Sequence, residues 1–135
     1  FGHFTFAEES KNPEYWFLAA GTGVTPFNSM IAEHAEKYPQ KKFFLLFSVR
    51  QKKDLFLVDE FRRLEKKRGN FTFLPTLTRE KWAEGLTGRV QSHVPKEVKN
   101  KTFYICGVKD FVIGVKDFLL DRGVAPEDLK LERYT

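Results

Sequence analysis

The chain has 135 residues, of which 41% are hydrophobic, 30% charged and 16% aromatic. This length suits a single domain, and fifteen Phe, four Tyr and two Trp supply enough core material to exclude a disordered chain. Twenty-three Lys and Arg against eighteen Asp and Glu give a net charge of +5, which favours an anionic partner: nucleic acid, an acidic protein or the phosphates of a small molecule.

The lengths of the apolar runs and the cysteine count exclude membrane spans and disulfides. No apolar run approaches roughly 18 residues without a charge, as a transmembrane helix requires. The single cysteine, Cys106, forbids an internal disulfide, a C-x-x-C redox pair and a cysteine-ligated iron–sulfur cluster. The chain opens on Phe1 with no signal-like segment, which is typical of the inside of a longer polypeptide. We therefore expect a cytoplasmic protein.

The first half of the chain alternates apolar runs with helical patterns. A short apolar run at 15–20 predicts a strand that stops at Gly21, and Pro26 then suits the first turn of a helix. The run at 42–49 is apolar on both faces, as in a central parallel strand. A helix over 58–68 follows, with its apolar residues three to four positions apart.

The second half continues the alternation. The strand expected at 70–77 contains Pro75 and so belongs at an edge of the sheet. A short helix around 89–94 precedes a fourth strand at 102–106, which we expect Gly107 to break. Two further elements complete the chain, namely a helix over 109–122 and a last strand over 129–132.

Five strands with intervening helices predict a three-layer α/β/α domain with a parallel, Rossmann-like sheet. We expect the strand order 3-2-1-4-5. Ligands of such folds bind beyond the carboxyl ends of the strands, where the strand order reverses. In this order the reversal lies between strands one and four, so Gly21 and Gly107 should face one crevice.

The first of these two turns reads Gly21-Thr22-Gly23-Val24-Thr25-Pro26 and lies directly between a strand and a helix. Glycines at such a place let the backbone approach a phosphate, which the helix N-terminus stabilises. The run is neither G-x-G-x-x-G nor a Walker loop, and a merely structural tight turn is the alternative interpretation.

The second turn and the basic run are weaker signals. Cys106 before Gly107 fits a small core residue as well as a functional one. The basic residues at 62–68 fit a solvated helix face, with nucleic-acid binding as the alternative; no aromatic residues interleave with them. His3, His34 and His93 are scattered, so no metal site is expected.

Together the motifs resemble the pyridine-nucleotide domain of the ferredoxin–NADP reductase and cytochrome b5 reductase superfamily. The resemblance rests on A-A-G-T-G-V-T-P-F at 19–27, I-C-G at 105–107 and L-E-R-Y near the end, and it covers essentially the whole chain. It implies hydride transfer between NAD(P)H and a flavin, with electrons passed to a ferredoxin, flavodoxin, haem or similar acceptor.

The resemblance also implies roles for single residues. Cys106 and Glu132 would lie near the reacting atoms, with Gly107 against the nicotinamide and Tyr134 near the flavin ring. The cofactor path would be lined by the turn after the first strand, namely Gly21, Thr22, Gly23, Thr25 and Pro26. Residues 1–8 resemble the tail of a preceding flavin domain, and 9–135 the nucleotide domain. FAD would be bound mainly by that domain, which this chain lacks, so the chain alone should be inactive.

The choice between NADPH and NADH depends on the adenosine 2′ position. An acid usually follows the second strand in NAD sites, but here Arg50 follows it and the first acid is Asp54. Arginine binds phosphate through two hydrogen bonds, and Arg50, Thr78, Arg79 and Arg89 fall where NADP-dependent relatives carry phosphate ligands. We expect NADPH, although these arginines also fit ordinary surface residues. A nucleotide-sensing module without catalysis is the alternative function.

Overall fold

The computed structural model describes residues 11–134, with side chains described as far as Glu132. The expected tail of a flavin domain at 1–8 lies outside the described residues. So does the side chain of Tyr134, although its backbone is described.

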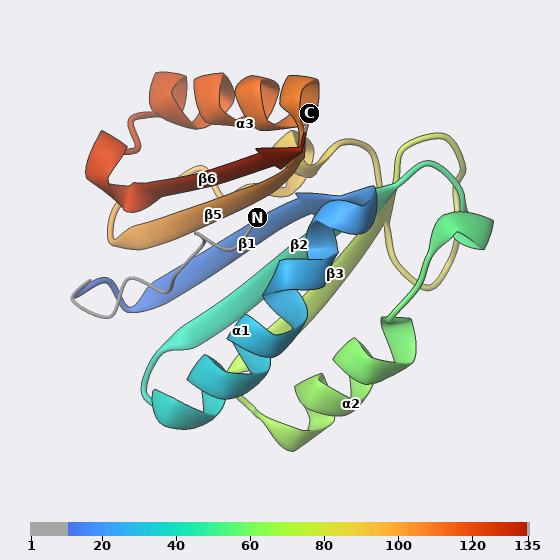
Figure 1. Ribbon diagram of the computed structural model, residues 1–135, viewed down its shortest axis with the longest axis horizontal. Coiled ribbons are helices and arrows are strands. Elements are labelled where there is room, and N and C mark those ends of the chain that lie inside the picture. The colour runs from blue at the N-terminus through green and yellow to red at the C-terminus, as the bar shows by residue number, and fades with distance from the viewer. Residues whose placement is uncertain (1–10, 135) are drawn as a thin grey trace.

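One parallel sheet organises the described chain, and its strands all point toward the same edge of the molecule (Figure 1). The order is β4-β3-β2-β1-β5-β6. The strands are β1 (Glu14–Ala20), β2 (Lys42–Val49), β3 (Phe71–Leu77), β4 (Leu86–Thr87), β5 (Lys101–Val108) and β6 (Leu129–Tyr134). This confirms the predicted order, since the five predicted strands correspond to β3, β2, β1, β5 and β6 in space.

Three details of the prediction are wrong. A sixth strand, β4, pairs Leu86 and Thr87 with the end of β3; two residues within a turn-rich segment are too few to show any alternation. The strand β3 is therefore not the edge strand that Pro75 predicted, although β4 pairs only with Thr76 and Leu77, beyond the proline. The expected break at Gly107 is also absent, because β5 continues to Val108 in register with β6. Glycine tolerates strand geometry, and hydrogen bonding to a neighbouring strand holds it there.

Helices cover both faces of the sheet. On one face lie α1 (Thr25–Lys37) and α2 (Val58–Lys67), and on the other lies α3 (Lys109–Arg122) (Figure 1). Short 3₁₀ turns join the elements: η1 (Gly21–Val24), η2 (Lys52–Asp54), η3 (Val90–His93) and η4 (Pro126–Asp128). The helix expected around 89–94 is thus only the single 3₁₀ turn η3.

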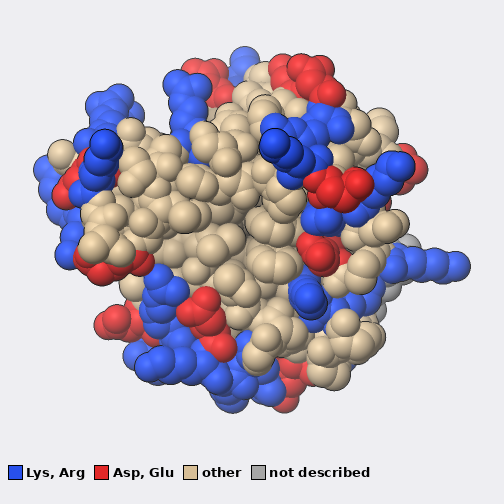
Figure 2. Space-filling view, turned by 180° about the vertical axis from the view of Figure 1, so that it is seen from behind, with Lys and Arg blue, Asp and Glu red and all other residues tan. Residues whose placement is uncertain are grey.

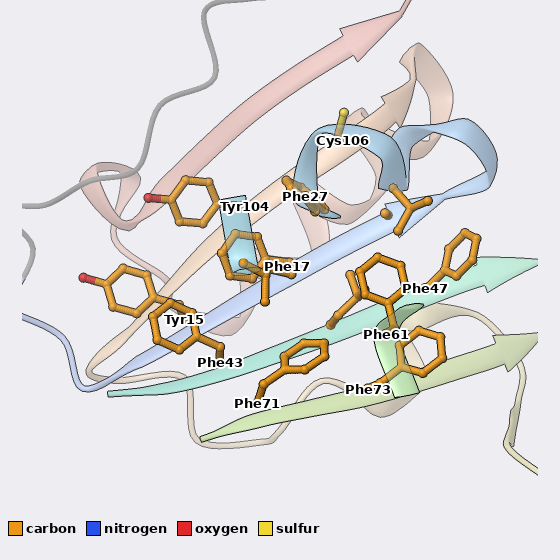
Figure 3. Close-up of a cluster of buried hydrophobic side chains, with 14 of the residues drawn as sticks. Tyr15, Phe17, Phe27, Phe43, Phe47, Phe61, Phe71, Phe73, Tyr104 and Cys106 are labelled. Atoms are coloured by element: carbon orange, nitrogen blue, oxygen red, sulfur yellow. The ribbon is translucent and has the colours of Figure 1, made fainter. Parts of the chain in front are cut away.

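The core consists of two apolar clusters separated by the sheet. The cluster under α1 and α2 contains stacked aromatic rings, among them Phe17 on Tyr104 at 4.8 Å and Tyr15 on Phe43 at 5.3 Å between ring centroids (Figure 3). The cluster under α3 is mostly aliphatic, with Val112, Val115 and Leu119 facing β1 and β5. A three-layer α/β/α domain is therefore the observed architecture, as predicted.

Asn70 connects the end of α1 to the loop before β2, at the edge of the sheet opposite the carboxyl ends of the strands. Its Nδ2 donates to the carbonyls of Ala35, Tyr38 and Lys41 at 3.0, 3.1 and 2.9 Å. We predict that Asn70→Ala lowers the free energy of unfolding by about 1–3 kcal/mol, because half-buried carbonyls lose their donor. Urea unfolding measures this loss. The exposed control Gln40→Ala should stay near wild type, and equal stabilities of both variants would contradict the structural role of Asn70.

Two kinds of feature are absent from the part of the chain that the structure describes. Among residues 11–134, no helix has the length and apolar character needed to cross a bilayer. The same stretch contains no group of three or more His, Cys, Asp or Glu arranged to hold a metal ion.

Candidate functional site

The turn after β1 leads directly into a helix, and no side chain caps it. Gly21 adopts φ +55°, a left-handed conformation that glycine reaches without strain. The chain then enters η1 and passes directly into α1, and neither helix has a capping side chain or an acidic residue in its first turn. The amides at the start of a helix carry partial positive charge, so such a turn suits an anionic ligand.

Gly23 brings this turn against the end of β5. A Cβ atom on Gly23 would lie 2.3 Å from the carbonyl oxygen of Cys106 and 2.9 Å from the Cα of Gly107. These are backbone atoms and cannot rotate away, so only glycine fits. The two segments that the sequence singles out therefore meet at one edge of the sheet, although neither cavity found at this edge is lined by both Gly21 and Gly107.

Cys106 and Glu132 are neighbours on adjacent strands, paired in register between β5 and β6. The Cys106 side chain is fully buried and stands at one end of the aromatic cluster, near the turn into α1 (Figure 3). Glu132 is half-buried. Cys106 thus has the packing role that the sequence left open, whatever further role it has.

A cavity of about 610 Å³ opens beside the first turn, at the carboxyl ends of β1, β2 and β3. It brings together Gly21, Thr22, Arg50 and Thr78, four of the residues proposed from the sequence. Five further wall residues were not proposed as site residues, among them Ser48, Asp54 and Phe56. Ser48 had a signal, because a polar residue at the end of an apolar strand is unusual; Phe56 had none.

A second cavity, of about 540 Å³, shares Ser48, Arg50 and Thr78 with the first and so adjoins it. Its walls also include Arg79 and Arg89. All three arginines are exposed, and none forms an ion pair with another described residue. The arginines that the sequence assigned to a phosphate therefore line one cavity, and none of them is held in an ion pair with another described residue. Its walls also hold Asp110 and Phe111, which sequence reasoning missed because they lie on α3, far along the chain.

Among the predicted residues with described side chains, Thr25, Pro26 and Gly107 lie outside both cavities. Thr25 is exposed and Pro26 half-buried, both in the first turn of α1. Gly107 is buried against Phe111, and the backbone of Tyr134 pairs with Val108.

Backbone pairing places Arg79 beside Arg50. The N–H groups of Thr78 and Arg79 donate to the carbonyls of Val49 and Arg50 at 3.0 and 2.9 Å, which extends the β2–β3 ladder beyond both strands. The Lys52 ammonium then reaches Glu84 at 2.8 Å. This hydrogen bond and the opposite charge raise the pKa of Lys52 above its ordinary value and lower that of Glu84. Both groups thus stay charged around neutral pH.

The largest cavity that we identify, about 640 Å³, lies at the opposite edge of the sheet. Its lining includes Lys42, Lys67 and Asn70 but none of the predicted site residues. It also lacks a glycine turn leading into a helix, so we place the candidate site at the carboxyl edge despite the smaller cavities there.

The basic run near the end of α2 is largely engaged in ion pairs. Arg62 contacts Glu65 at 3.0 Å, and Arg68 contacts Glu36 at 3.0 Å. Such pairs suit the solvated helix face expected from the sequence.

Known proteins resemble this chain in sequence. Residues 17–117 match the family described as the oxidoreductase NAD-binding domain. Ferredoxin–NADP reductase B of Sorangium cellulosum is 30% identical over 98% of this chain and 59% of its own length. One component of the Na⁺-translocating NADH-quinone reductase of Histophilus somni is 28% identical over 99% of this chain and 35% of its own.

A solved structure agrees in fold. The Amycolatopsis cytochrome P450 reductase GcoB superimposes on all of this chain and on 42% of its own, with a TM-score of 0.90 at 20% identity. The chain thus spans less than two thirds of each of these proteins. Because the family match covers most of the chain, including the end of β1, the glycine turn and Cys106, we conclude that the chain belongs to the oxidoreductase NAD-binding domain family.

Proposed function

We propose that this chain is the nucleotide-binding half of an FAD-dependent oxidoreductase that exchanges a hydride with NADPH. The observation that carries the proposal is the convergence at the carboxyl edge. There the uncapped turn at Gly21 opens on one cavity, and the adjoining cavity holds three arginines with no carboxylate partner among the described residues.

The proposal assigns a binding role to each part of the carboxyl edge of the sheet. The amides that follow Gly21 bind the pyrophosphate, with Thr22, Gly23, Thr25 and Pro26 shaping its path. The guanidinium groups of Arg50, Arg79 and Arg89, together with the Thr78 hydroxyl, bind the adenosine 2′-phosphate. The relatives do not decide this preference, since the names of two of them specify NADP and NADH respectively.

The reacting end of the nucleotide belongs, in this proposal, at the junction of β1 and β5. A nucleotide bound there would supply the hydride to a flavin, and this chain's own residues would not have to provide a general base for that transfer. In this proposal Gly107 lies against the nicotinamide, and the Cys106 thiol excludes water from its surroundings. Glu132 pairs in register with Cys106 across β5 and β6, and Tyr134 is proposed to lie against the flavin.

The proposal requires further parts beyond this chain. FAD is to be held mainly by a flavin domain preceding it, which makes the isolated chain catalytically inactive. Electrons then pass to a ferredoxin, flavodoxin or haem acceptor in the cytoplasm. The net charge of +5 favours an acidic acceptor, because opposite charges speed encounter. Figure 2 shows Lys and Arg, interspersed with Asp and Glu, around an uncharged area of one face.

The direct test uses the whole protein, including the sequence upstream of Phe1. NADPH is mixed with it under anaerobic conditions while the flavin absorbance is followed in a stopped-flow instrument. We expect a bound yellow flavin that bleaches within a single turnover. A protein that binds NADP⁺ but contains no flavin, or whose flavin neither NADPH nor NADH reduces, would contradict the proposal and favour a nucleotide sensor.

Cys106→Ala separates the proposed role of the thiol from its packing role. We expect hydride transfer in the whole protein to slow by about tenfold, because the reacting rings lose their fixed neighbour, while NADP⁺ affinity stays within about threefold. Single-turnover flavin reduction and calorimetric titration measure the two effects. A variant with reduced thermal stability but an unchanged rate would restrict Cys106 to packing.

A further inference from the structure

We propose that Lys52, Glu80 and Glu84 form a clamp that positions Arg79 beside Arg50 and thereby sets the preference for a 2′-phosphorylated nucleotide. The inference rests on the proposed 2′-phosphate site and adds to it three residues that do not line its cavity. They are positioning residues, since they act through Arg79.

The first observation is how the loop carrying Arg79 is held. At its start, backbone bonds join Thr78 and Arg79 to the end of β2. At its far end, the Trp82 indole donates to the Leu86 carbonyl at 2.6 Å, and the Gly88 N–H donates to Leu77 at 2.8 Å. Both ends of the loop are therefore held by hydrogen bonds. Only its middle stretch, which passes η2, needs a further contact to fix it.

The clamp fastens that middle stretch through one residue of η2. The Lys52 backbone N–H donates to Glu80 Oε1 at 3.0 Å, while its ammonium contacts Glu84 at 2.8 Å. Glu80 follows Arg79 directly in the chain, so its carboxylate limits where the Arg79 backbone can go. Lys52 stands two residues after Arg50, so one contact pair couples both arginine-bearing segments.

The second observation is that η2 is itself fixed and can serve as an anchor. Gln51 and Asp54 form a reciprocal capping box, in which the Gln51 N–H donates to Asp54 Oδ2 at 3.2 Å. Because η2 is held in place, a contact to it also fixes the loop that carries Arg79. A contact to a flexible turn would not do so. Two hydrogen bonds to a phosphate need both guanidinium groups in defined places, so this positioning bears on the 2′-phosphate alone.

Charge and position make opposite predictions at Glu84, which gives a sharp test. Glu84→Gln removes a negative charge near the arginines, and electrostatics alone would then strengthen phosphate binding. A clamp predicts the reverse, because the tie to Lys52 is weakened. The probes are 2′,5′-ADP and 5′-AMP, which differ only in the 2′-phosphate, and the readout is the ratio of their dissociation constants, measured by calorimetry.

We expect wild type to prefer 2′,5′-ADP clearly, and both Glu84→Gln and Lys52→Ala to reduce that preference by about threefold, the scale of an exposed ion pair. The exchange Lys52→Glu with Glu84→Lys should restore it to within about twofold. Lys53→Ala, which removes an equal charge from an exposed neighbour without an ion pair among the described residues, should change it little.

The remaining outcomes distinguish the two hypotheses. An unchanged or increased preference in Glu84→Gln, with wild type preferring 2′,5′-ADP, would overturn the clamp and leave the nucleotide site intact. No preference in wild type would overturn the NADPH assignment and the clamp with it. Thermal unfolding of each variant ensures that folded proteins are compared, and all three clamp positions are exposed.

Discussion

Gly23→Ala is expected to lower the free energy of unfolding by about 1–3 kcal/mol and to weaken NADP⁺ binding by about tenfold or more. The added methyl group would lie 2.3 Å from the Cys106 carbonyl oxygen, so η1 must move away from β5. That movement displaces the amides proposed to hold the pyrophosphate. Urea unfolding and calorimetric titration with NADP⁺ measure the two effects.

Gly69→Ala is the matched control for this change. No atom lies within 4 Å of a Cβ placed on Gly69, and the residue is not in a left-handed conformation. The same methyl group should therefore leave stability and NADP⁺ binding near wild type. If Gly23→Ala behaved like Gly69→Ala in both measurements, the close packing of the two turns would be irrelevant to the site.

Arg79→Ala is the change expected to separate the two nucleotides most strongly. We expect NADPH affinity to fall by about 10–100-fold, because a charge-assisted contact to the 2′-phosphate is lost, and NADH affinity to change less than about twofold. Fluorescence or calorimetric titration of both nucleotides gives the two ratios. A higher salt concentration should reduce the difference between the effects on NADPH and on NADH affinity, because the arginines are exposed.

Arg63→Ala removes the same charge from the exposed surface of α2, where Arg63 contacts Glu60 at 3.6 Å. It should leave both affinities close to wild type. Equal losses of NADPH and NADH binding in Arg79→Ala would show that Arg79 acts on a part common to both nucleotides and does not recognise the 2′-phosphate.

Much of the fold followed from patterns in the sequence that survive folding. The run at 42–49 is apolar on both faces and became the central strand β2 over the same residues. The helix predicted over 109–122 is α3, ended by Gly123 at φ +106°. These elements were predictable because burial on two faces, helical spacing and a terminal glycine are local signals.

Contacts between segments that are far apart along the chain could not be predicted from the sequence. Nothing local marks the two residues of β4, which exist as a strand only because the end of β3 lies beside them. Likewise, Asp110 and Phe111 reach the arginine cavity only through the fold, which carries α3 to the same edge. The glycine turn and Arg50 were found because they directly follow strands, and the carboxyl ends of parallel strands share one edge.

The central claim is that a dinucleotide occupies the edge where the Gly21 turn, the end of β5 and the three arginines converge. Titrating isotope-labelled protein with NADP⁺ while recording backbone amide resonances tests it most directly. We predict that the largest shifts fall on Thr22, Gly23, Gly107 and Arg79, with Asn70 and the opposite cavity unaffected. Shifts centred on Asn70 and Lys42, with the Gly21 turn unmoved, would contradict the account.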